Sequence, residues 1–427
     1  MLYQKKKLKN GLKVIVSPIK NTKTVTLLVL LGVGSKYETK KLNGISHFLE
    51  HLVFKGTKSR PSPGQIFKEL DRVGATYNAF TSKENTGFWV KTSSADFDLG
   101  LDIISDILLH PLLYAEEIEK ERGVILQEIN MYEDDPKRRV SDILENIIYG
   151  DKPIGRDVIG TRETVRGIKR EEVVSYKNRH YRGGSIVVAV AGDIDPRPAN
   201  KKISKIFSQI SPGATRRGEL VKLSGKASRA RFIEKDLDQT HLALAFDGYD
   251  MFDERRYALN VLSVILGGNS SSRLFMEIRE KLGLAYYVYA YNNYYTDSGY
   301  LGIHAGIPHE KREDVIKKIM AILKSVKEKG VSQNELKEAK GYLRGQISLH
   351  LETTDDIASY LASQELFYKK IITPEETIKR IEKVTNRDIL KVAKDVLNPR
   401  GGSVVAIGRG GGGKSGRGNY RSLLNLL

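Results

Sequence analysis

The chain repeats itself, and this repeat limits its fold to two copies of one domain. A double glycine followed by a short apolar run occurs at Gly183-Gly184 and again at Gly401-Gly402, 218 residues later (401 − 183). The same offset aligns the charged helical segment 118–129 with the segment 336–347. Two unrelated domains would not keep one register over both segments, so we expect two domains of the same fold.

Strand patterns precede helix patterns within the first half. Short runs of alternating apolar residues predict strands at 12–18, 24–32, 75–80, 86–92 and 185–192. Longer amphipathic runs predict helices at 94–110, 115–134, 136–148 and 163–180. This order is typical of an α+β fold, a mostly antiparallel sheet with helices packed on one side. We expect homologous domains at 1–193 and 220–408, a linker at 194–219 and a flexible Gly/Arg/Lys-rich tail at 409–427.

A pentapeptide of the first half, His47-Phe48-Leu49-Glu50-His51, indicates metal chemistry. On a helix, His47 and His51 lie one turn apart on the same face, where two imidazoles can bind one Zn²⁺. Glu50 lies beside them and can take a proton from a water molecule. The order H-x-x-E-H is the inverse of the commoner zincin motif. The corresponding segment of the second half, 257–266, has no histidine, so only the first half can bind metal in this way.

A catalytic zinc usually takes a third protein ligand from another segment. The predicted helix 115–134 offers Glu121 and Glu128, which are seven residues apart and therefore share a face. Taken singly, each could be a solvent-facing acid of a charged helix. The repeat favours a role at the metal, because the equivalent residues in the half without histidines are Ala339 and Gln346.

In combination, these motifs resemble the pitrilysin/insulysin superfamily of inverzincin metallopeptidases, most closely the processing-peptidase branch that includes mitochondrial processing peptidase. The resemblance covers residues 1–408. The segments that carry it are Asn10–Val14, Gly44–Thr57, Tyr77–Ser82, Glu121–Glu128, Pro153–Gly155 and Asn269–Tyr286.

The resemblance implies a zinc endopeptidase that acts on peptides or unfolded proteins. His47, His51 and Glu128 would bind one Zn²⁺ per chain, Glu50 would be the general base, and Glu121 would orient a ligating imidazole. An edge strand would pair with an extended peptide, and its residues are Tyr77, Asn78, Ala79, Phe80 and Thr81.

The resemblance also implies a partner. Arg279 and Tyr286 match residues of the family's catalytically silent half that hold the scissile carbonyl and its developing charge. Family members enclose the substrate in a chamber of four such domains. This chain supplies two, so we expect a homodimer in which Arg279 and Tyr286 reach the zinc of the partner chain.

Two other functions fit parts of the sequence. A non-catalytic scaffold of the same fold, like the core subunits of respiratory complexes, is disfavoured by the intact set His47, Glu50, His51 and Glu128. A nucleotide-binding protein is suggested by residues 408–415, which fit the phosphate-binding pattern G-x-x-x-x-G-K-S after a strand. Only 12 residues follow Ser415, too few for the helix and parallel strands that such a site needs.

Composition excludes several further classes. The chain has no cysteine, so disulfides and thiolate metal sites are excluded. Its net charge of +18 would suit nucleic acid, but the cations alternate with acids and no stripe of basic and aromatic residues is present. No run of 18 apolar residues could span a membrane, and no apolar signal segment precedes the first strand. We therefore expect a cytoplasmic protein that does not bind nucleic acid.

Overall fold

A computed structural model describes residues 2–215, 218–221, 223, 229–368, 370–410 and 420–427. The chain divides into two compact units, and neither is continuous in sequence. Unit 1 consists of Met1–Asn130, Arg156–Glu219 and Ser348–Thr373. Unit 2 consists of Met131–Gly155, Leu220–Ile347 and Pro374–Leu427.

Unit 1 contains a six-stranded sheet in the order β1-β2-β6-β3-β5-β4. Its strands are β1 (Gln4–Lys7), β2 (Lys13–Pro18), β3 (Thr24–Leu31), β4 (Thr76–Thr81), β5 (Thr86–Ser93) and β6 (Ile186–Gly192). All neighbours are antiparallel except β2 and β6, which run parallel. The apolar side chains of β3 and β6 are almost all buried, because helices cover both faces of the central strands.

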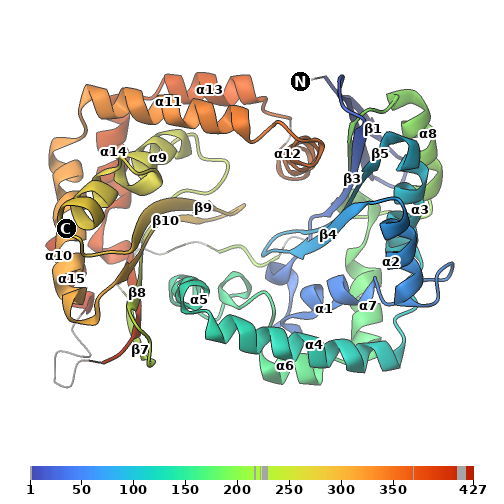
Figure 1. The fold of residues 1–427 in the computed structure, drawn as a ribbon, viewed down its shortest axis with the longest axis horizontal. Coiled ribbons are helices and arrows are strands. Elements are labelled where there is room, and N and C mark those ends of the chain that lie inside the picture. The colour runs from blue at the N-terminus through green and yellow to red at the C-terminus, as the bar shows by residue number, and fades with distance from the viewer. Residues whose placement is uncertain (1, 216–217, 222, 224–228, 369, 411–419) are drawn as a thin grey trace. The chain divides into compact units, whose positions relative to one another are not determined.

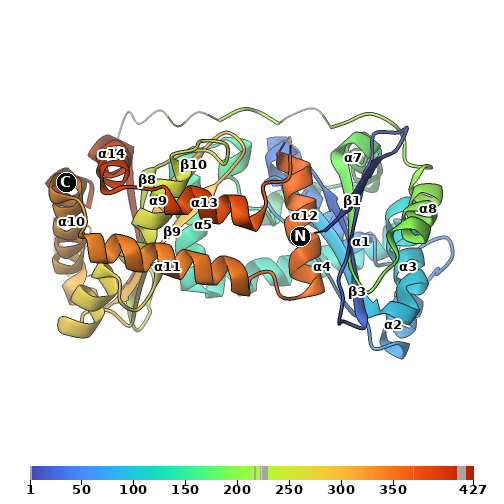
Figure 2. The ribbon, with the colours of Figure 1, turned by 90° about the horizontal axis from the view of Figure 1, so that it is seen from above.

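The helices of unit 1 come from both halves of the sequence. They are α1 (Ile45–Leu52), α2 (Pro63–Arg72), α3 (Phe97–Leu109), most of α4 (Ala115–Asp134), α6 (Arg162–Gly167), α7 (Arg170–His180), α8 (Pro196–Phe207) and α12 (Thr354–Phe367). Helix α3 packs on β3 and β5, whereas α12 packs on β3 and β6 (Figures 1 and 2). The cluster beneath α12 contains Leu28 and Leu30 of β3 together with Leu361. Since side chains alternate along a strand, α12 and α3 cover opposite faces of the sheet.

Unit 2 repeats this plan with five strands in the order β7-β11-β8-β10-β9. The strands are β7 (Arg229–Glu234), β8 (Thr240–Asp247), β9 (Tyr287–Tyr294), β10 (Gly299–Ile307) and β11 (Gly402–Gly408). Only β7 and β11 run parallel among the described pairs. The helices are α5 (Pro136–Tyr149), α9 (Arg256–Ser263), α10 (Arg312–Lys329), most of α11 (Gln333–Leu349), α13 (Pro374–Glu382), α14 (Asn386–Val396) and α15 (Tyr420–Leu423), with π-helical turns η6 (Val264–Gly268) and η7 (Phe275–Lys281).

The two halves of the sequence therefore exchange a helix. Helix α5 lies in the first half, between β5 and β6, but packs on β8 and β11 of unit 2, where Ile143 and Leu144 meet Val405. Helix α12 makes the reverse exchange. The two α+β sheets agree with the predicted fold class, and α4 and α11 begin 218 residues apart (333 − 115). The expectation of helices on one side only does not hold for the unit 1 sheet, because the second half supplies α12 to its other face.

The predicted ranges 1–193 and 220–408 differ from the two units, because the first contains α5 of unit 2 and the second contains α12 of unit 1. The predicted linker 194–219 contains α8, whose Ala199, Ile203 and Phe207 are buried in unit 1.

The C-terminal end also differs from the predicted flexible tail. Tyr420 and Leu424 are 4% and 0% exposed and belong to the apolar core of unit 2. Helix α15 and the turn that follows pack on α10, so the segment 420–427 is docked. Tyr420, Leu423, Leu424 and Leu427 form one apolar face there. The prediction missed this face because it was based on the glycine-rich composition of 409–418. Residues 411–419, and with them most of the stretch 408–415, lie outside the described residues.

Candidate metal centre

Helix α1 presents two histidines because its other face is apolar. Ile45, Phe48, Leu49 and Leu52 are fully buried, which turns the remaining face toward α4. His47 and His51 lie on that face with ring centroids 4.6 Å apart.

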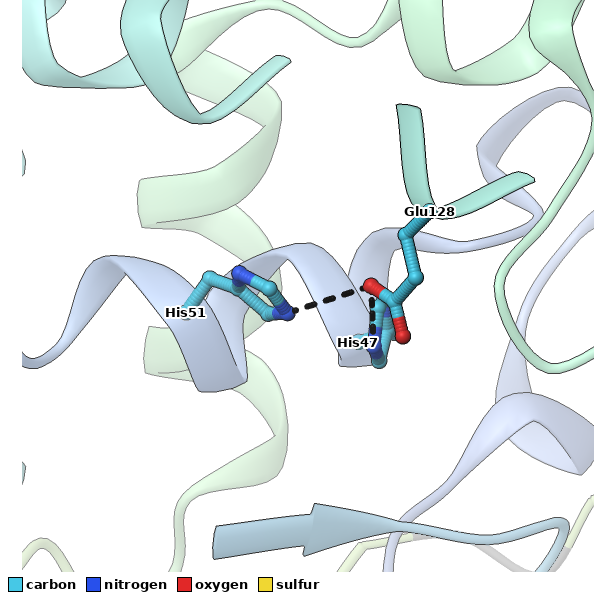
Figure 3. Close-up of side chains that lie close together, drawn as sticks. All are labelled: His47, His51 and Glu128. Atoms are coloured by element: carbon cyan, nitrogen blue, oxygen red, sulfur yellow. Dashed lines mark ion pairs between the residues drawn. The ribbon is translucent and has the colours of Figure 1, made fainter. Parts of the chain in front are cut away.

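Glu128 of α4 completes the cluster. Its Oε2 atom lies 3.6 Å from Nε2 of His47 and 3.6 Å from Nε2 of His51 (Figure 3). One ligand atom from each of the three residues lies within 4.8 Å of the others. Two atoms that are each about 2.1 Å from a zinc ion at a tetrahedral angle are about 3.4 Å apart. Two imidazoles and one carboxylate at these spacings therefore fit a zinc ion that keeps an open position.

Glu121 holds the ring of His51 from its other side. Nδ1 of His51 lies 3.0 Å from Oε2 of Glu121, so the imidazole donates there and keeps the lone pair of Nε2 for a metal. Lys55 contacts Oε1 of Glu121 at 2.7 Å. Burial opposes the charge of Glu121, but the bonds from His51 and Lys55 outweigh it and lower the pKa of this carboxyl. Burial likewise opposes protonation of His51, yet the bond to Glu121 and the nearby Glu50 raise its pKa.

Glu50 lies beside the cluster without belonging to it. The hydroxyl of Thr81, the last residue of β4, donates to Oε2 of Glu50 at 2.6 Å. Burial raises the pKa of Glu50, and the bond from Thr81 partly opposes this shift. The predicted base and the end of the predicted peptide-binding strand are therefore in direct contact.

The residues Tyr77 to Thr81 lie on β4, an edge strand that pairs only with β5 in the described sheet. A cavity of about 270 Å³ opens beside this strand. Phe54, Phe67 and Tyr77 line it and stack with centroid distances of 6.4 and 5.9 Å. Glu50 and His51 line the same cavity, so an aromatic pocket adjoins the candidate catalytic group.

Arg279 and Tyr286 belong to unit 2, whereas the cluster belongs to unit 1. The Arg279 side chain is 42% exposed and its guanidinium lies 4.7 Å from the centre of the Phe275 ring. Tyr286, just before β9, is 78% exposed.

Sequence reasoning missed two side-chain contacts that support the cluster, those of Lys55 with Glu121 and of Thr81 with Glu50. Lys55 lies four residues after His51 but three residues beyond the end of α1 at Leu52, so helical spacing could not have indicated its contact with Glu121. No local pattern signals that Thr81 meets Glu50, because 31 residues separate them and the sheet brings them together.

The comparisons with known proteins decide the family. The description "Insulinase (Peptidase family M16)" matches residues 13–162, and "Peptidase M16 inactive domain" matches residues 167–343. A Streptomyces coelicolor protein named as an uncharacterized zinc protease is 36% identical over 92% of this chain and 87% of its own. The chain belongs to peptidase family M16. The inactive-domain description covers Ala339, which stands where the first half of this M16 protein has the acid Glu121.

Other relatives and solved structures resemble this M16 protein over nearly its whole length. The uncharacterized zinc protease YmxG of Bacillus subtilis is 34% identical over 91% of this chain and 94% of the relative. A protease from Helicobacter pylori has the same fold, with a TM-score of 0.89, 24% identity and coverage of 95% and 99% of the two chains. The M16 inactive-domain structure from Pseudomonas fluorescens also reaches 0.89, at 21% identity over 96% and 98%. Among the described residues of the M16 chain, no helix is both long and apolar enough to cross a membrane.

Proposed function

We propose that this M16 protein is a zinc-dependent endopeptidase that cleaves peptides bound in extended form. The observation that carries the proposal is the convergence of His47, His51 and Glu128 beside a separate carboxylate, Glu50. The zinc-protease names of its relatives favour the same metal and reaction. A scaffold protein would have no need of this donor set.

Different residues of the chain would bind the metal, transfer the proton and orient the general base. A bound Zn²⁺ would polarise a peptide carbonyl and lower the pKa of a water molecule. Nε2 of His47, Nε2 of His51 and Oε2 of Glu128 would hold the ion. Glu50 would accept a proton from the attacking water at a carboxylate oxygen and pass it to the leaving amine. Thr81 would keep that carboxylate in place through the bond to Oε2.

The edge of β4 would bind the substrate. Its outer row of backbone N–H and C=O groups can pair with an extended peptide, which fixes the main chain and tolerates many sequences. The pocket lined by Phe54, Phe67 and Tyr77 would take an apolar side chain near the cleaved bond. We also propose the homodimer described above, with Arg279 and Tyr286 completing the partner's site.

Zinc content and hydrolysis of a quenched fluorescent peptide test this function. The wild-type protein should hold one zinc ion per chain. Glu50→Gln should keep that ion but lose peptide hydrolysis by at least about a hundredfold, because glutamine cannot accept the proton. Glu116→Gln, an exposed change of the same kind on α4, should leave both unchanged. Substantial hydrolysis by Glu50→Gln would contradict the role of Glu50, and a zinc-loaded but inactive wild type would favour the scaffold alternative.

A further inference from the structure

A fully enclosed carboxylate, Glu38, holds the start of helix α1 from outside the helix. Its side chain is 3% exposed. Oε1 accepts the backbone N–H of Ser46 at 2.8 Å, and Oε2 accepts the backbone N–H of Gly44 at 2.7 Å. Oε2 also accepts the Asn43 side-chain amide at 3.0 Å. Every one of these partners is a donor, and Ser46 is the residue before His47.

Helix α1 depends on this carboxylate because it has no cap of its own. Its N-cap residue is Gly44, which has no side chain to accept the first N–H groups of the helix. Another residue could not replace Gly44, since its φ is +97° and a Cβ there would lie 2.6 Å from the carbonyl oxygen of Ile159. A buried carboxylate from elsewhere in the chain therefore supplies the acceptors, and its negative charge suits the positive end of the helix.

The short segment that contains Glu38 also binds the β4–β5 turn through hydrogen bonds and an ion pair. This segment contains the 3-10 turn η1 (Ser35–Tyr37). The backbone N–H of Ser35 donates to the carbonyl oxygen of Ser82 at 3.1 Å, and the backbone N–H of Lys36 donates to the carbonyl oxygen of Lys83 at 2.8 Å. Lys36 also forms a buried ion pair with Glu84 at 2.7 Å. One segment thus joins the end of β4, where Thr81 meets Glu50, to the start of the helix that carries both histidines.

We propose that Glu38 is a positioning residue that sets helix α1 against α4, and through it the approach of His47 and His51 to Glu128. The inference rests on the proposed function, because it assigns Glu38 a part in forming the same zinc site. Without the two backbone bonds, the first turn of α1 would lose its anchor one residue before His47. The histidines would then no longer be held at the spacing that a shared ion needs.

The chemistry of the site requires a carboxylate rather than an amide. Burial raises the pKa of Glu38, and the bonds from Ser46, Asn43 and Gly44 oppose this shift. Glutamine has nearly the same shape, but one of its two terminal groups is an NH₂ donor. In either orientation that donor would face a backbone N–H, of Gly44 or of Ser46, and leave it without an acceptor.

Glu38→Gln therefore separates positioning from simple packing. Zinc affinity is measured by competition with a chromophoric chelator, at a temperature where wild type and variant are both fully folded. Replacing a partner that orients metal ligands commonly weakens binding by about 10–100-fold, so we expect at least a tenfold loss here. The visible spectrum of the Co²⁺-loaded variant should also change, since it reports ligand geometry. Glu171→Gln removes the same charge from an exposed position on α7, and it should alter neither the zinc affinity nor the Co²⁺ spectrum.

A second variant covers the case in which Glu38→Gln folds poorly. Glu38→Asp keeps the charge on a side chain one methylene shorter, and it should give an intermediate zinc affinity. Wild-type affinity and an unchanged Co²⁺ spectrum in either folded variant would overturn the inference and leave Glu38 a purely structural residue. If the wild-type protein itself failed to bind zinc, the proposed function would be overturned, and this inference with it.

Discussion

Glu128 and its counterpart Gln346 differ in charge, and therefore in how strongly each side chain can bind a metal ion. The two occupy equivalent positions of α4 and α11. Glu128→Gln should weaken zinc binding by more than about a hundredfold, since loss of even an orienting partner costs roughly 10–100-fold. Gln346→Ala is the matched change in the other half and should alter neither zinc content nor hydrolysis. Metal analysis after dialysis against a mild chelator checks both. Full retention of zinc by Glu128→Gln would mean that another acid is the third ligand.

Only part of the candidate site could be predicted from the sequence. His47, Glu50 and His51 are close in sequence, so helical geometry alone groups them. The repeat indicates Glu121 and Glu128 together, through their contrast with Ala339 and Gln346, and the family resemblance assigns the ligand role to Glu128. The contact of Thr81 with Glu50 and the part played by Glu38 could not be found, because both depend on the packing of the sheet and of a short turn against α1. Metal ligands that are close in sequence form a pattern that can be recognised there. The side chains that hold those ligands in place are brought to them by tertiary packing and form no such pattern.

For the helices of the first half, the sequence predicts most of the segments, although α8 lies within the expected linker 194–219. It does not predict which sheet each helix covers. The segment 136–148 was expected as a helix and is α5, yet it packs on the sheet of unit 2. An amphipathic pattern gives the apolar face of a helix and no information about its partner. Helices α5 and α12 begin 218 residues apart (354 − 136) and so hold equivalent places in the repeat, and each covers an apolar face of the sheet formed mainly by the other half.

The C-terminal helix α15 and the turn after it should contribute to the stability of unit 2. Leu424 is fully buried in the core of unit 2, whereas Leu426 is 45% exposed. Leu424→Ala should destabilise the protein by roughly 2–5 kcal/mol, as buried leucines do, and Leu426→Ala should have little effect. Deletion of 420–427 should lower the unfolding midpoint at least as far as Leu424→Ala does. Denaturant unfolding followed by circular dichroism measures all three. Equal midpoints for the deletion and the wild type would show that the segment does not contribute to the core in solution.

At the scale of the whole molecule, the chain has two similar folds with unequal chemistry. Unit 1 carries the candidate zinc-ligand set, while among the described residues unit 2 has no cluster of the same kind. A duplicated fold that keeps one site can use its second copy to bind substrate or to complete another chain's site. The exposed side chains of Arg279 and Tyr286 make the second use testable.

Mixing of two inactive variants tests whether the site is shared between chains. A homodimer of Glu50→Gln and one of Arg279→Ala/Tyr286→Ala would each contain two damaged sites. If Arg279 and Tyr286 serve the partner's zinc, a mixed dimer has one site with both defects and one intact site. Peptide hydrolysis should then recover to about half the wild-type rate per mixed dimer if the two sites act independently. If the pair serves the zinc of its own chain, every site in the mixed dimer keeps one defect and no activity returns. Subunit exchange is verified with two affinity tags, so the absence of recovery in confirmed mixed dimers would rule out the shared site.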